Sequence, residues 1–307
     1  MLQVFAGSAA YPRDMPRPVL TIGNFDGLHL GHRHLISALV AKAKAKDVPA
    51  AVYTFDPPPR VVLSPDAHPP RIQSWPDKVR ILGELGVDHV IVERFTRAFA
   101  QHPASWFLDE VLGRRIQPMG MVVGYDTRFG RGRAGDVSTL KAAFPEIEVS
   151  QIHALKIDGQ VVSSSEIRTL VTAGEVAQAS VLLGCPHRIR GTVMHGDGRG
   201  HTLGFPTANL LTEAMLTPAR GVYAVRAQVE DGPWHHAVAN LGTRPTFDGQ
   251  SFLIEVHLLD HTEDLYGCGL NIEFVARLRG ETTFEGPDDL IQQIQRDIAQ
   301  ARAVLSP

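Results

Sequence analysis

The sequence predicts an α/β protein with two parts: a parallel sheet flanked by helices, then a small antiparallel β-barrel with a closing helix. Three observations support this prediction. In the first part, apolar runs alternate with stretches whose apolar residues recur at helical spacing. After Gly184-Cys185-Pro186, short strand-like runs alternate with Gly, Pro and Asp turns. Near the end, residues 287–304 have the periodicity of one amphipathic helix.

The elements of the first part follow in the order of repeated βα units. Apolar runs predict strands at residues 19–22, 50–55, 89–92, 120–124 and 147–152. Helical spacing predicts helices between them at residues 31–46, 76–85, 104–112 and 137–144. Such units form a parallel sheet with helices on both faces, and its ligands bind at the carboxyl ends of the strands.

A predicted helical pair, residues 164–172 and 175–183, precedes the second part. Strands are then predicted at residues 189–194, 221–229, 234–240, 252–259 and 271–278. Short strands between turn residues are typical of a small antiparallel barrel. The closing helix begins with Pro287 and has apolar residues at helical spacing. We therefore expect two domains, residues 1–184 and 185–307.

Composition places the chain among ordinary globular proteins. Of its 307 residues, 44% are hydrophobic and 21% are charged, and the formal net charge is -3. This balance favours neither a nucleic-acid partner nor, without a long apolar run, a membrane partner. The two cysteines, Cys185 and Cys268, cannot form a disulfide framework or a CxxC zinc site. With no signal-peptide pattern at the N-terminus, we expect a cytoplasmic protein.

The most informative segment is GNFDGLHLGH, residues 23–32, which we call the histidine turn. It joins a predicted strand to a predicted helix, and its glycines let the backbone approach a ligand closely. His29 and His32 are three residues apart and therefore neighbours on one helix face. Two imidazoles beside the free N–H groups of a helix N-terminus form an anion site, and a nucleotide triphosphate is the natural anion.

The histidine turn resembles the HxGH signature of nucleotidyltransferases, in which the histidines bind ATP phosphates during adenylyl transfer. For a lone histidine, a surface position would be the simpler explanation. Here two histidines, a strand before them and a helix after them coincide. The resemblance adds three ATP- or phosphate-binding positions in the same turn: Gly23, Phe25 and Gly31.

A second segment, VSSSEIR at residues 162–168, places hydroxyl groups before a helix. Ser164 or Ser165 can cap that helix, which alone would be the ordinary explanation. The planar guanidinium of Arg168 suits phosphate. The segment resembles the ISSTxxR signature of the same nucleotidyltransferases, with Val162 for Ile and Ser165 for Thr. The resemblance implies that Ser164, Ser165 and Arg168 hold ATP phosphates.

Residues 130–135, GRGRAG, match the pattern GxGxxG literally. A dinucleotide-binding fingerprint turns directly from a strand into a helix, whereas residues 125–129 intervene here. The match therefore does not favour a Rossmann dehydrogenase. The surrounding stretch, VVGYDTRFGRGRAGD, resembles a flavin- and nucleotide-binding loop.

In the second part, HGDGRGHTLGFPTANL at residues 195–210 is the strongest motif. A Gly-rich loop can wrap phosphates with backbone N–H groups. Thr207 and Asn209 are two residues apart, so they offer oxygen atoms on one side of an extended segment. Oxygen ligands suit Mg²⁺. For the tetrapeptide PTAN alone, a β-turn with a structural Asn would be the simpler explanation.

Later segments of the second part occur in the order expected of a riboflavin kinase module. They are GVYAV from residue 221, NLGTRPTF from 240, EVHLLD from 255, DLYG from 264 and FVARLRGETTF from 274. Nearly the whole chain thus resembles the bifunctional prokaryotic FAD synthetases, which join a riboflavin kinase to an FMN adenylyltransferase. The resemblance implies a Rossmann-like nucleotidyltransferase sheet and a kinase barrel. It also implies riboflavin, FMN and ATP as substrates and Mg²⁺ as cofactor; both a monomer and a homo-oligomer stay open.

The resemblance also assigns roles to individual residues. In the kinase, Glu255 matches the catalytic base, and Thr207 and Asn209 match the magnesium ligands. The loop glycines Gly196 and Gly204 match phosphate-binding positions. In the adenylyltransferase, the residues that match catalytic positions are His29, His32 and Arg168. Two acidic residues match positions at the flavin or the nucleotide: Asp56 and Asp126.

The chain departs from the family pattern at two positions. Pro58 replaces the His of the family's TFxPHP, which puts a donor on the flavin or nucleotide side in doubt. His201 replaces an Arg in the family's RGRTLGFPTAN, which puts one phosphate contact in doubt.

Two other functions are alternatives for this sequence. HLGH also resembles the HIGH motif of class I aminoacyl-tRNA synthetases, but no KMSKS-like segment follows and the acidic balance offers no tRNA surface. A flavin or nucleotide sensor that binds without turnover is the other alternative. The full set of matched catalytic residues argues against lost catalysis.

Overall fold

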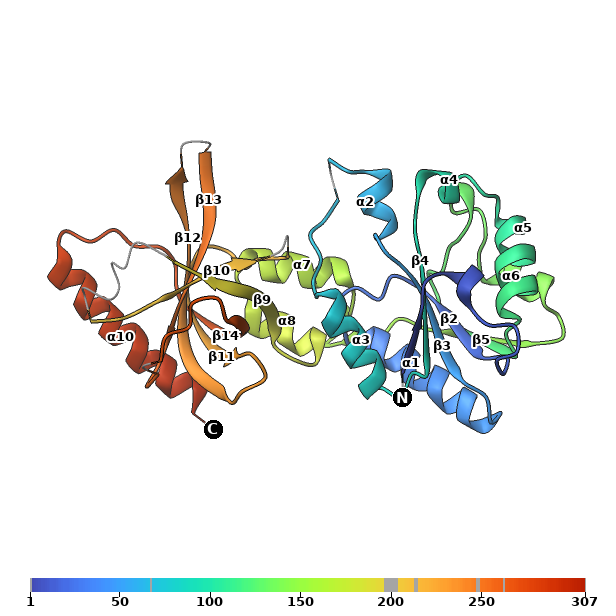
Figure 1. Cartoon of the computed structure of the whole chain (residues 1–307), viewed down its shortest axis with the longest axis horizontal. Coiled ribbons are helices and arrows are strands. Elements are labelled where there is room, and N and C mark those ends of the chain that lie inside the picture. The colour runs from blue at the N-terminus through green and yellow to red at the C-terminus, as the bar shows by residue number, and fades with distance from the viewer. Residues whose placement is uncertain are drawn as a thin grey trace. The chain divides into compact units, whose positions relative to one another are not determined.

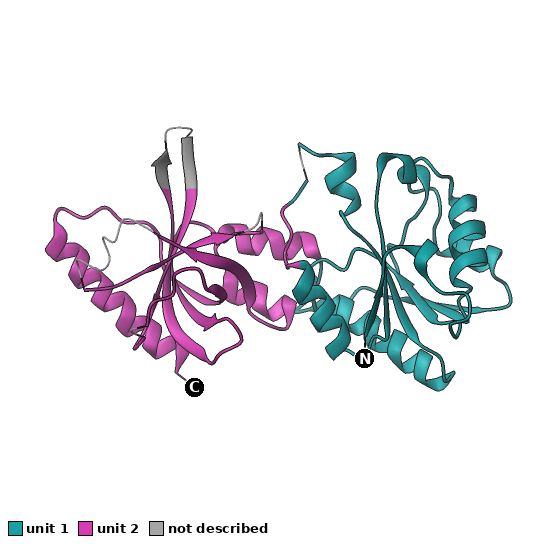
Figure 2. Ribbon diagram, in the orientation of Figure 1, with its two compact units in different colours: residues 1–69, 75–163 teal, residues 70–74, 164–307 magenta. Residues whose placement is uncertain are grey.

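The computed structural model describes residues 2–66, 68–195, 204–212, 215–246, 249–261 and 263–306. The chain forms two compact units (Figure 2). The first consists of Met1–Pro69 and Trp75–Ser163, and we call it the sheet unit. The second consists of Pro70–Ser74 and Ser164–Pro307, and we call it the barrel unit. The short segment Pro70–Ser74 therefore leaves the sheet unit and packs with the barrel unit.

The sheet unit is built on six parallel strands in the order β1-β4-β3-β2-β5-β6 (Figure 1). Their bounds are β1 Gln3–Phe5, β2 Val19–Ile22, β3 Ala50–Phe55, β4 His89–Glu93, β5 Gly120–Gly124 and β6 Glu148–Ile152. Five strands and the parallel sheet are confirmed. The sequence did not predict β1, because three mostly exposed residues at a sheet edge leave no apolar run.

Helices cover both faces of this sheet, as predicted from the βα order. They are α1 Leu30–Ala45, α2 Pro59–Leu63, α3 Trp75–Glu84, α4 Arg97–Ala100, α5 Ala104–Trp106, the π-helix η2 Phe107–Ile116 and α6 Val137–Ala143. Short 3-10 turns lie at η1 Ser8–Ala10 and η3 Arg131–Arg133, and β7 Lys156–Ile157 pairs with β8 Gln160–Val161. The predicted helix 104–112 is thus longer, because α5 continues directly into η2.

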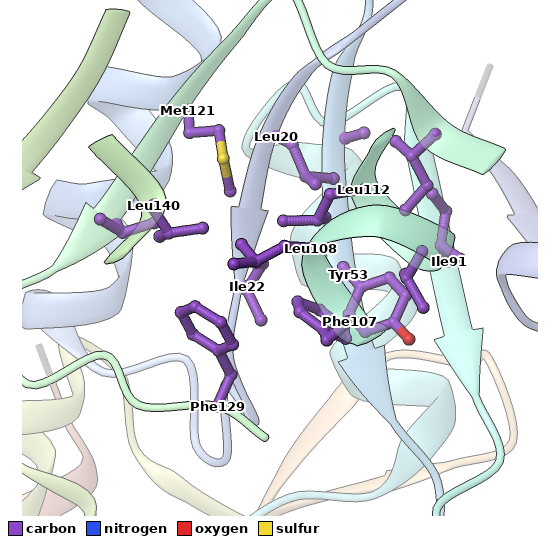
Figure 3. Packing of buried hydrophobic residues seen from close by; sticks show 14 of the residues in the cluster. Leu20, Ile22, Tyr53, Ile91, Phe107, Leu108, Leu112, Met121, Phe129 and Leu140 are labelled. Carbon is purple, nitrogen blue, oxygen red and sulfur yellow. The ribbon is translucent and has the colours of Figure 1, made fainter. Parts of the chain in front are cut away.

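Two hydrophobic layers hold the helices to the sheet. On one face, residues of β2, β3 and β5 pack against η2 and α6, as Figure 3 shows for Leu20, Tyr53, Phe107 and Leu140. On the other face, residues of α1 and α3 pack against the same strands. Because β2, β3 and β5 bury side chains on both faces, their sequences read as continuous apolar runs.

The barrel unit is a closed antiparallel barrel in the order β10-β13-β12-β11-β14-β9. The strands are β9 His187–Met194, β10 Ala208–Thr212, β11 Gly221–Val229, β12 Trp234–Thr246, β13 Gly249–Leu258 and β14 Gly269–Arg279. The closing helix α10 spans Pro287–Leu305, and its Asp297 accepts hydrogen bonds from Arg279 on β14. The barrel and closing helix are confirmed; β10 was not predicted as a strand, because its five residues follow a Gly- and Pro-rich loop.

The helical pair, α7 Ser164–Ala173 and α8 Val176–Leu183, packs on the barrel. Val176 belongs to the barrel core, and an Arg277 Nη1–H donates to the Ala173 carbonyl at 3.3 Å. Along the chain, the boundary between the two compact units therefore lies between residues 163 and 164, ahead of the helical pair. The division into domains 1–184 and 185–307 stays a prediction about which segment folds on its own.

Candidate functional site

The histidine turn leads from β2 into the first turn of α1. The rings of His29 and His32 stack, with centroids 3.6 Å apart and planes 18° apart. His29 caps the helix, because its Nδ1 accepts a hydrogen bond from the His32 backbone N–H at 3.3 Å. A neutral imidazole has one acceptor nitrogen and one N–H donor, so the proton of His29 lies on Nε2. The predicted pairing of the two rings at a helix N-terminus is confirmed.

The backbone of this turn is strained, and packing holds it. Phe25 has φ 48° and Leu28 has φ 39°, values that are uncommon outside glycine. Both side chains are buried, and the Leu28 carbonyl accepts from Arg33 Nε at 3.0 Å. A strained turn persists only where its surroundings determine it, and such turns cluster at functional sites. The Phe25 ring lies edge-on to His32, so Phe25 can offer a ligand only its backbone.

Close contacts explain why two positions of the turn are glycine. A Cβ on Gly31 would lie 3.2 Å from His29 Nδ1 and 3.4 Å from the Val162 carbonyl oxygen. A Cβ on Gly23 would lie 2.9 Å from the Phe25 ring. The contact with the Val162 carbonyl also shows that the start of the VSSSEIR segment lies against the histidine turn within the sheet unit.

Burial keeps both histidines neutral. It lowers the pKa of His29 to about 4, against a smaller opposing effect of a backbone hydrogen bond. Burial also lowers the pKa of His32 well below its usual value, and the charges of His29 and Lys78 add to this. At neutral pH the turn therefore presents N–H donors rather than imidazolium charges.

The sequence analysis missed Lys78, whose charge lies close to His32. Its side chain is only 7% exposed, and its Nζ donates to the Asn24 carbonyl at 2.8 Å. The sequence carried a signal, because Lys78 stands at helical spacing with Ile81 and Leu82 on the buried face of α3. A lysine on an apolar helix face is rarely buried without a specific partner.

Asp56 and Asp126 follow the two strands that lie on either side of β2, the strand that leads into the histidine turn. Asp56 follows β3 and Asp126 follows β5, and these strands are the two neighbours of β2. All three carboxyl ends lie at one edge because the sheet is parallel. Asp56 is half-buried and Asp126 is exposed. The placement agrees with a role at a ligand, but which ligand each residue contacts stays a prediction.

A group of aromatic side chains near the end of β3 was not predicted. Phe55 ends β3 and contacts Phe95 and Phe99 edge-on, with centroids 5.5 and 6.1 Å away. Trp106 contacts Phe99 and stacks on His102 at 3.7 Å. All five rings are half-buried. The sequence signal is the density of aromatic residues at positions 95–106.

Residues 130–135 form a closed loop. Phe129 and Gly135 exchange both backbone hydrogen bonds, at 3.1 and 2.9 Å, and η3 lies between them. The segment does not turn directly from a strand into a helix, which agrees with the rejection of a dinucleotide fingerprint.

Ser164, Ser165 and Arg168 lie at the start of α7, in the barrel unit. The Arg168 guanidinium donates to the Pro70 carbonyl at 3.1 Å and to the Ser164 carbonyl at 3.3 Å. The histidines belong to the sheet unit. That these residues and the histidines bind one nucleotide therefore stays a prediction.

In the barrel unit, the predicted kinase residues meet across neighbouring strands. Asn209 on β10 lies directly opposite Glu255 on β13, and Glu255 lies directly opposite Asn240 on β12. Asn240 Nδ2 donates to Glu255 Oε2 at 3.2 Å. We call Asn209, Glu255 and Asn240 the polar row. No role for Asn240 was predicted from the sequence, although it begins the segment NLGTRPTF.

The polar row faces away from the barrel core. Its strand neighbours are buried in the barrel interior: Ala208, Leu210, Ala239, Leu241, Ile254 and Val256. Because side chains alternate along a strand, Asn209, Glu255 and Asn240 point outward. Thr207 precedes Asn209 by two residues and is half-buried. The strand period therefore places Thr207 on the same side as the row.

The described part of the Gly-rich loop is short. Gly204 has φ 86°, and nothing lies within 4 Å of a Cβ built on it. Gly196 and His201 lie outside the described residues. Among the residues that the structure describes, no three His, Cys, Asp or Glu side chains converge as a metal site. The oxygens of Thr207, Asn209 and Glu255 suit Mg²⁺, which commonly completes its shell with phosphates and water.

Comparisons with known proteins cover both units. The riboflavin kinase family model matches residues 183–305, and the FAD synthetase family model matches residues 12–166. The bifunctional riboflavin kinase/FMN adenylyltransferase of Haemophilus influenzae is 37% identical over 98% of this chain and 99% of its own. The protein of the same name from Escherichia coli K12 is 39% identical over 92% of this chain and 91% of its own. The chain belongs to the bifunctional riboflavin kinase/FMN adenylyltransferase family.

One solved structure resembles the chain over its full length. It is a protein of Streptococcus pneumoniae named as a macrolide-efflux protein, with a TM-score of 0.89, 30% identity and 98% coverage of both chains. The present chain therefore shares its fold with that protein. In the described residues of the present chain, no helix is long and apolar enough to cross a membrane.

Proposed function

We propose that the two activities of the family are divided between the polar row of the barrel unit and the histidine turn of the sheet unit. The chain is a bifunctional transferase. It phosphorylates riboflavin with ATP to give FMN, and it adenylylates FMN with a second ATP to give FAD and pyrophosphate. The stacked, neutral histidine pair at the start of α1 supports the second assignment, and the Asn209–Glu255–Asn240 register supports the first.

In the kinase reaction, the Glu255 carboxylate accepts the proton of the riboflavin 5′-hydroxyl. The hydroxyl oxygen attacks the γ-phosphate of ATP, and ADP leaves. Asn240 orients the carboxylate through its hydrogen bond to Oε2. A positioned general base contributes about 10²–10⁴-fold to such a step.

Mg²⁺ would be held by Thr207 and Asn209 together with ATP phosphates, and it would neutralise charge on the transferred phosphoryl group. Gly204 and the Gly-rich loop with Gly196 would bind phosphate through backbone N–H groups.

In the adenylyltransferase reaction, an FMN phosphate oxygen attacks the α-phosphorus of ATP, the α–β bridge breaks, and pyrophosphate leaves. The FMN phosphate needs no activation by a base, because its second ionisation lies near pH 6. His29 and His32 act as neutral N–H donors to the phosphates, beside the free backbone N–H groups at the start of α1. Preorganised donors stabilise the transition state because they need no reorganisation when charge shifts. Ser164, Ser165 and Arg168 are proposed to hold phosphates as well.

The aromatic group around Phe55, Phe99 and Trp106 is our candidate for the flavin ring of FMN. Aromatic rings pack favourably on planar π-systems in stacked or edge-on geometry. Asp56 follows Phe55 directly and is proposed to contact the flavin or the nucleotide. Asp126 is proposed for the same edge of the sheet.

We propose Mg²⁺ as the cofactor and the cytoplasm as the location. We propose no nucleic-acid or membrane partner, and both a monomer and a homo-oligomer stay open.

One assay tests these assignments against the alternatives. The full chain is incubated with riboflavin, ATP and Mg²⁺, and FMN and FAD are resolved by chromatography; a parallel sample contains EDTA. FMN and FAD should both form, and both should be lost with EDTA. Flavin binding without any product would favour the sensor, and amino-acid-dependent pyrophosphate exchange would favour the aminoacyl-tRNA synthetase. FAD synthesis unaffected by EDTA would contradict the magnesium assignment.

A further inference from the structure

A buried lysine lies under the histidine turn. Lys78 is the third residue after the start of α3, and its side chain is 7% exposed. Its Nζ lies 5.7 Å from the centroid of the Trp75 ring and donates to the Asn24 carbonyl at 2.8 Å. A buried charge is costly unless other groups compensate it. A hydrophobic side chain would fill this position on the helix at lower cost, so the charge requires another explanation.

The Asn24 carbonyl, to which Lys78 donates, lies at the start of the strained part of the turn. Asn24 directly precedes Phe25, the first residue with positive φ. The same carbonyl also accepts from Thr54 Oγ1 on β3, at the longer distance of 3.4 Å. Two elements thus fix the peptide from which the strained segment begins. The strained segment ends at His29, where the helix cap begins.

The charge of Lys78 acts on His32 as well. His29 stacks on one face of this ring, Phe25 lies at its edge, and Lys78 from α3 is close enough for its charge to act on it. The Lys78 charge adds to burial in lowering the pKa of His32. The Nδ1 of His32 is buried and has no hydrogen-bond partner among the residues that the structure describes. Lys78 therefore favours the neutral form of a ring that the proposed function uses as a donor.

We propose that Lys78 is a positioning residue for adenylyl transfer, whose ammonium fixes the Asn24 carbonyl and thereby the strained turn that presents His29 and His32. This inference rests on the proposed role of the histidine turn. The positive charge also lies close to the residues that would meet the ATP phosphates, so it favours an anion there.

The first test replaces Lys78 by Met, which keeps the apolar stem and removes the charge and the donor. Hydrogen bonds to charged groups contribute about 1.5–3 kcal/mol, so kcat/KM for FAD formation from supplied FMN should fall about 10- to 100-fold. Lys78→Arg should recover most of this loss. Riboflavin phosphorylation by the same preparation serves as the internal control for a folded barrel unit.

A matched control uses another lysine of the same unit, the half-buried Lys42. Lys42 lies near the far end of α1 and pairs with Glu148 at 2.6 Å. Lys42→Met removes one lysine charge without touching the histidine turn, so FAD formation should stay within twofold of wild type. If Lys78→Met does not fold by circular dichroism, Lys78→Gln carries the same test: it removes the charge, and its side chain is one atom shorter than lysine, so the amide nitrogen does not reach the position from which Nζ donates to the Asn24 carbonyl.

A second readout separates this role from simple structural support. Imidazole NMR titration should show a higher pKa for His32 in Lys78→Met or Lys78→Gln than in wild type, and no change in Lys42→Met. A folded Lys78→Met or Lys78→Gln variant that forms FAD within twofold of wild type would overturn the proposal. An arginine variant as impaired as the Met variant would also overturn it.

The outcome is distinguishable from failure of the proposed function. If His32→Ala abolishes FAD formation while the Lys78 variants retain it, only the role of Lys78 is wrong. If neither His32→Ala nor the Lys78 variants affect FAD formation, the ATP phosphates do not bind at the histidine turn, and both assignments are wrong.

Discussion

The histidine turn and the polar row position their functional groups in opposite ways. The turn places His29 and His32 on a loop with positive φ at Phe25 and Leu28, held by buried side chains and by Lys78 from another helix. The polar row places Glu255 on a regular strand, opposite Asn209 and Asn240. In the first case packing determines the geometry, and in the second case strand register does. The two sites should therefore fail for different reasons when residues are changed.

Their exposure to solvent also differs. His29 is 5% exposed, and both histidines are neutral because of burial. Glu255 is half-buried and Asn240 is exposed on the outer barrel surface. Acid should therefore lower the folding stability of the region around the histidine turn, because protonation of the buried histidines is unfavourable in the folded state. The polar row can lose a side chain without leaving a cavity in the barrel core.

The largest expected effect is on the kinase. Glu255→Gln keeps the shape and the hydrogen bond from Asn240 but removes the base, so FMN formation from riboflavin should fall about 10²–10⁴-fold. FAD formation from supplied FMN should stay near wild type. Chromatography of both products measures the two rates in one preparation.

The control for this variant is Glu285→Gln, the same chemical change at an exposed residue ahead of α10. It should leave both reactions unchanged. A folded Glu255→Gln protein that cannot adenylylate supplied FMN would contradict the assignment of two separate sites.

The next effect is on adenylyl transfer. Removing one donor to a developing negative charge costs about 3 kcal/mol, so His32→Ala should lower FAD formation by at least about 10². Replacing His29 as well should lower it further, with FMN accumulating from riboflavin. His32→Ala is the sharper variant because the cap uses the His29 ring and only the backbone of His32.

His34→Ala is the matched control, since His34 is exposed on the same helix. It should form FAD at the wild-type rate. Near wild-type FAD formation by the His29 and His32 double variant would mean that the ATP phosphates bind elsewhere.

Sequence reasoning predicted the two architectures and most strands, because their signals are local. The apolar runs at β2, β3 and β5 match the strand bounds, and the HxGH spacing fixes the stacked pair on α1. It also predicted Glu255 and Asn209 through the family resemblance. That they are direct neighbours depends on strand pairing, which no local pattern encodes.

The missed features depend on contacts between distant segments. Lys78 looks like a misplaced polar residue on a helix until its partner, the Asn24 carbonyl, is known. Asn240 lies in a quoted motif, but its bond to Glu255 requires the register of β12 and β13. The helical pair α7–α8 was predicted correctly as helices, yet its packing on the barrel follows from Val176 and Arg277, which are far apart in sequence.

The third prediction concerns the extent of the barrel unit. A fragment of residues 183–307 contains the polar row and should convert riboflavin to FMN without making FAD. A fragment of residues 164–307 should do the same and be more stable by about 2–3 kcal/mol, because it keeps Val176 buried in the barrel core. Urea unfolding followed by circular dichroism compares the two. Equal stability would mean that the helical pair does not support the barrel, and a folded fragment without kinase activity would mean that the sheet unit supplies part of the kinase site.

The smallest expected effect is a pH dependence of stability that arises at the histidine turn and not at the polar row. Burial lowers the pKa of His29 from 6.5 to about 4, so the unfolded chain binds a proton that the folded chain does not. Between these values the free energy of unfolding rises with pH, and stability is lost as pH falls. From pH 7 to pH 5 this one group should cost the sheet unit about 2 kcal/mol. His29→Ala should remove that part of the pH dependence, whereas His34→Ala should keep it. Urea unfolding at both pH values measures the difference. If wild type and His29→Ala lose the same stability between pH 7 and pH 5, His29 is not held neutral by burial. Burial would then not distinguish the electrostatics of the histidine turn from those of the polar row.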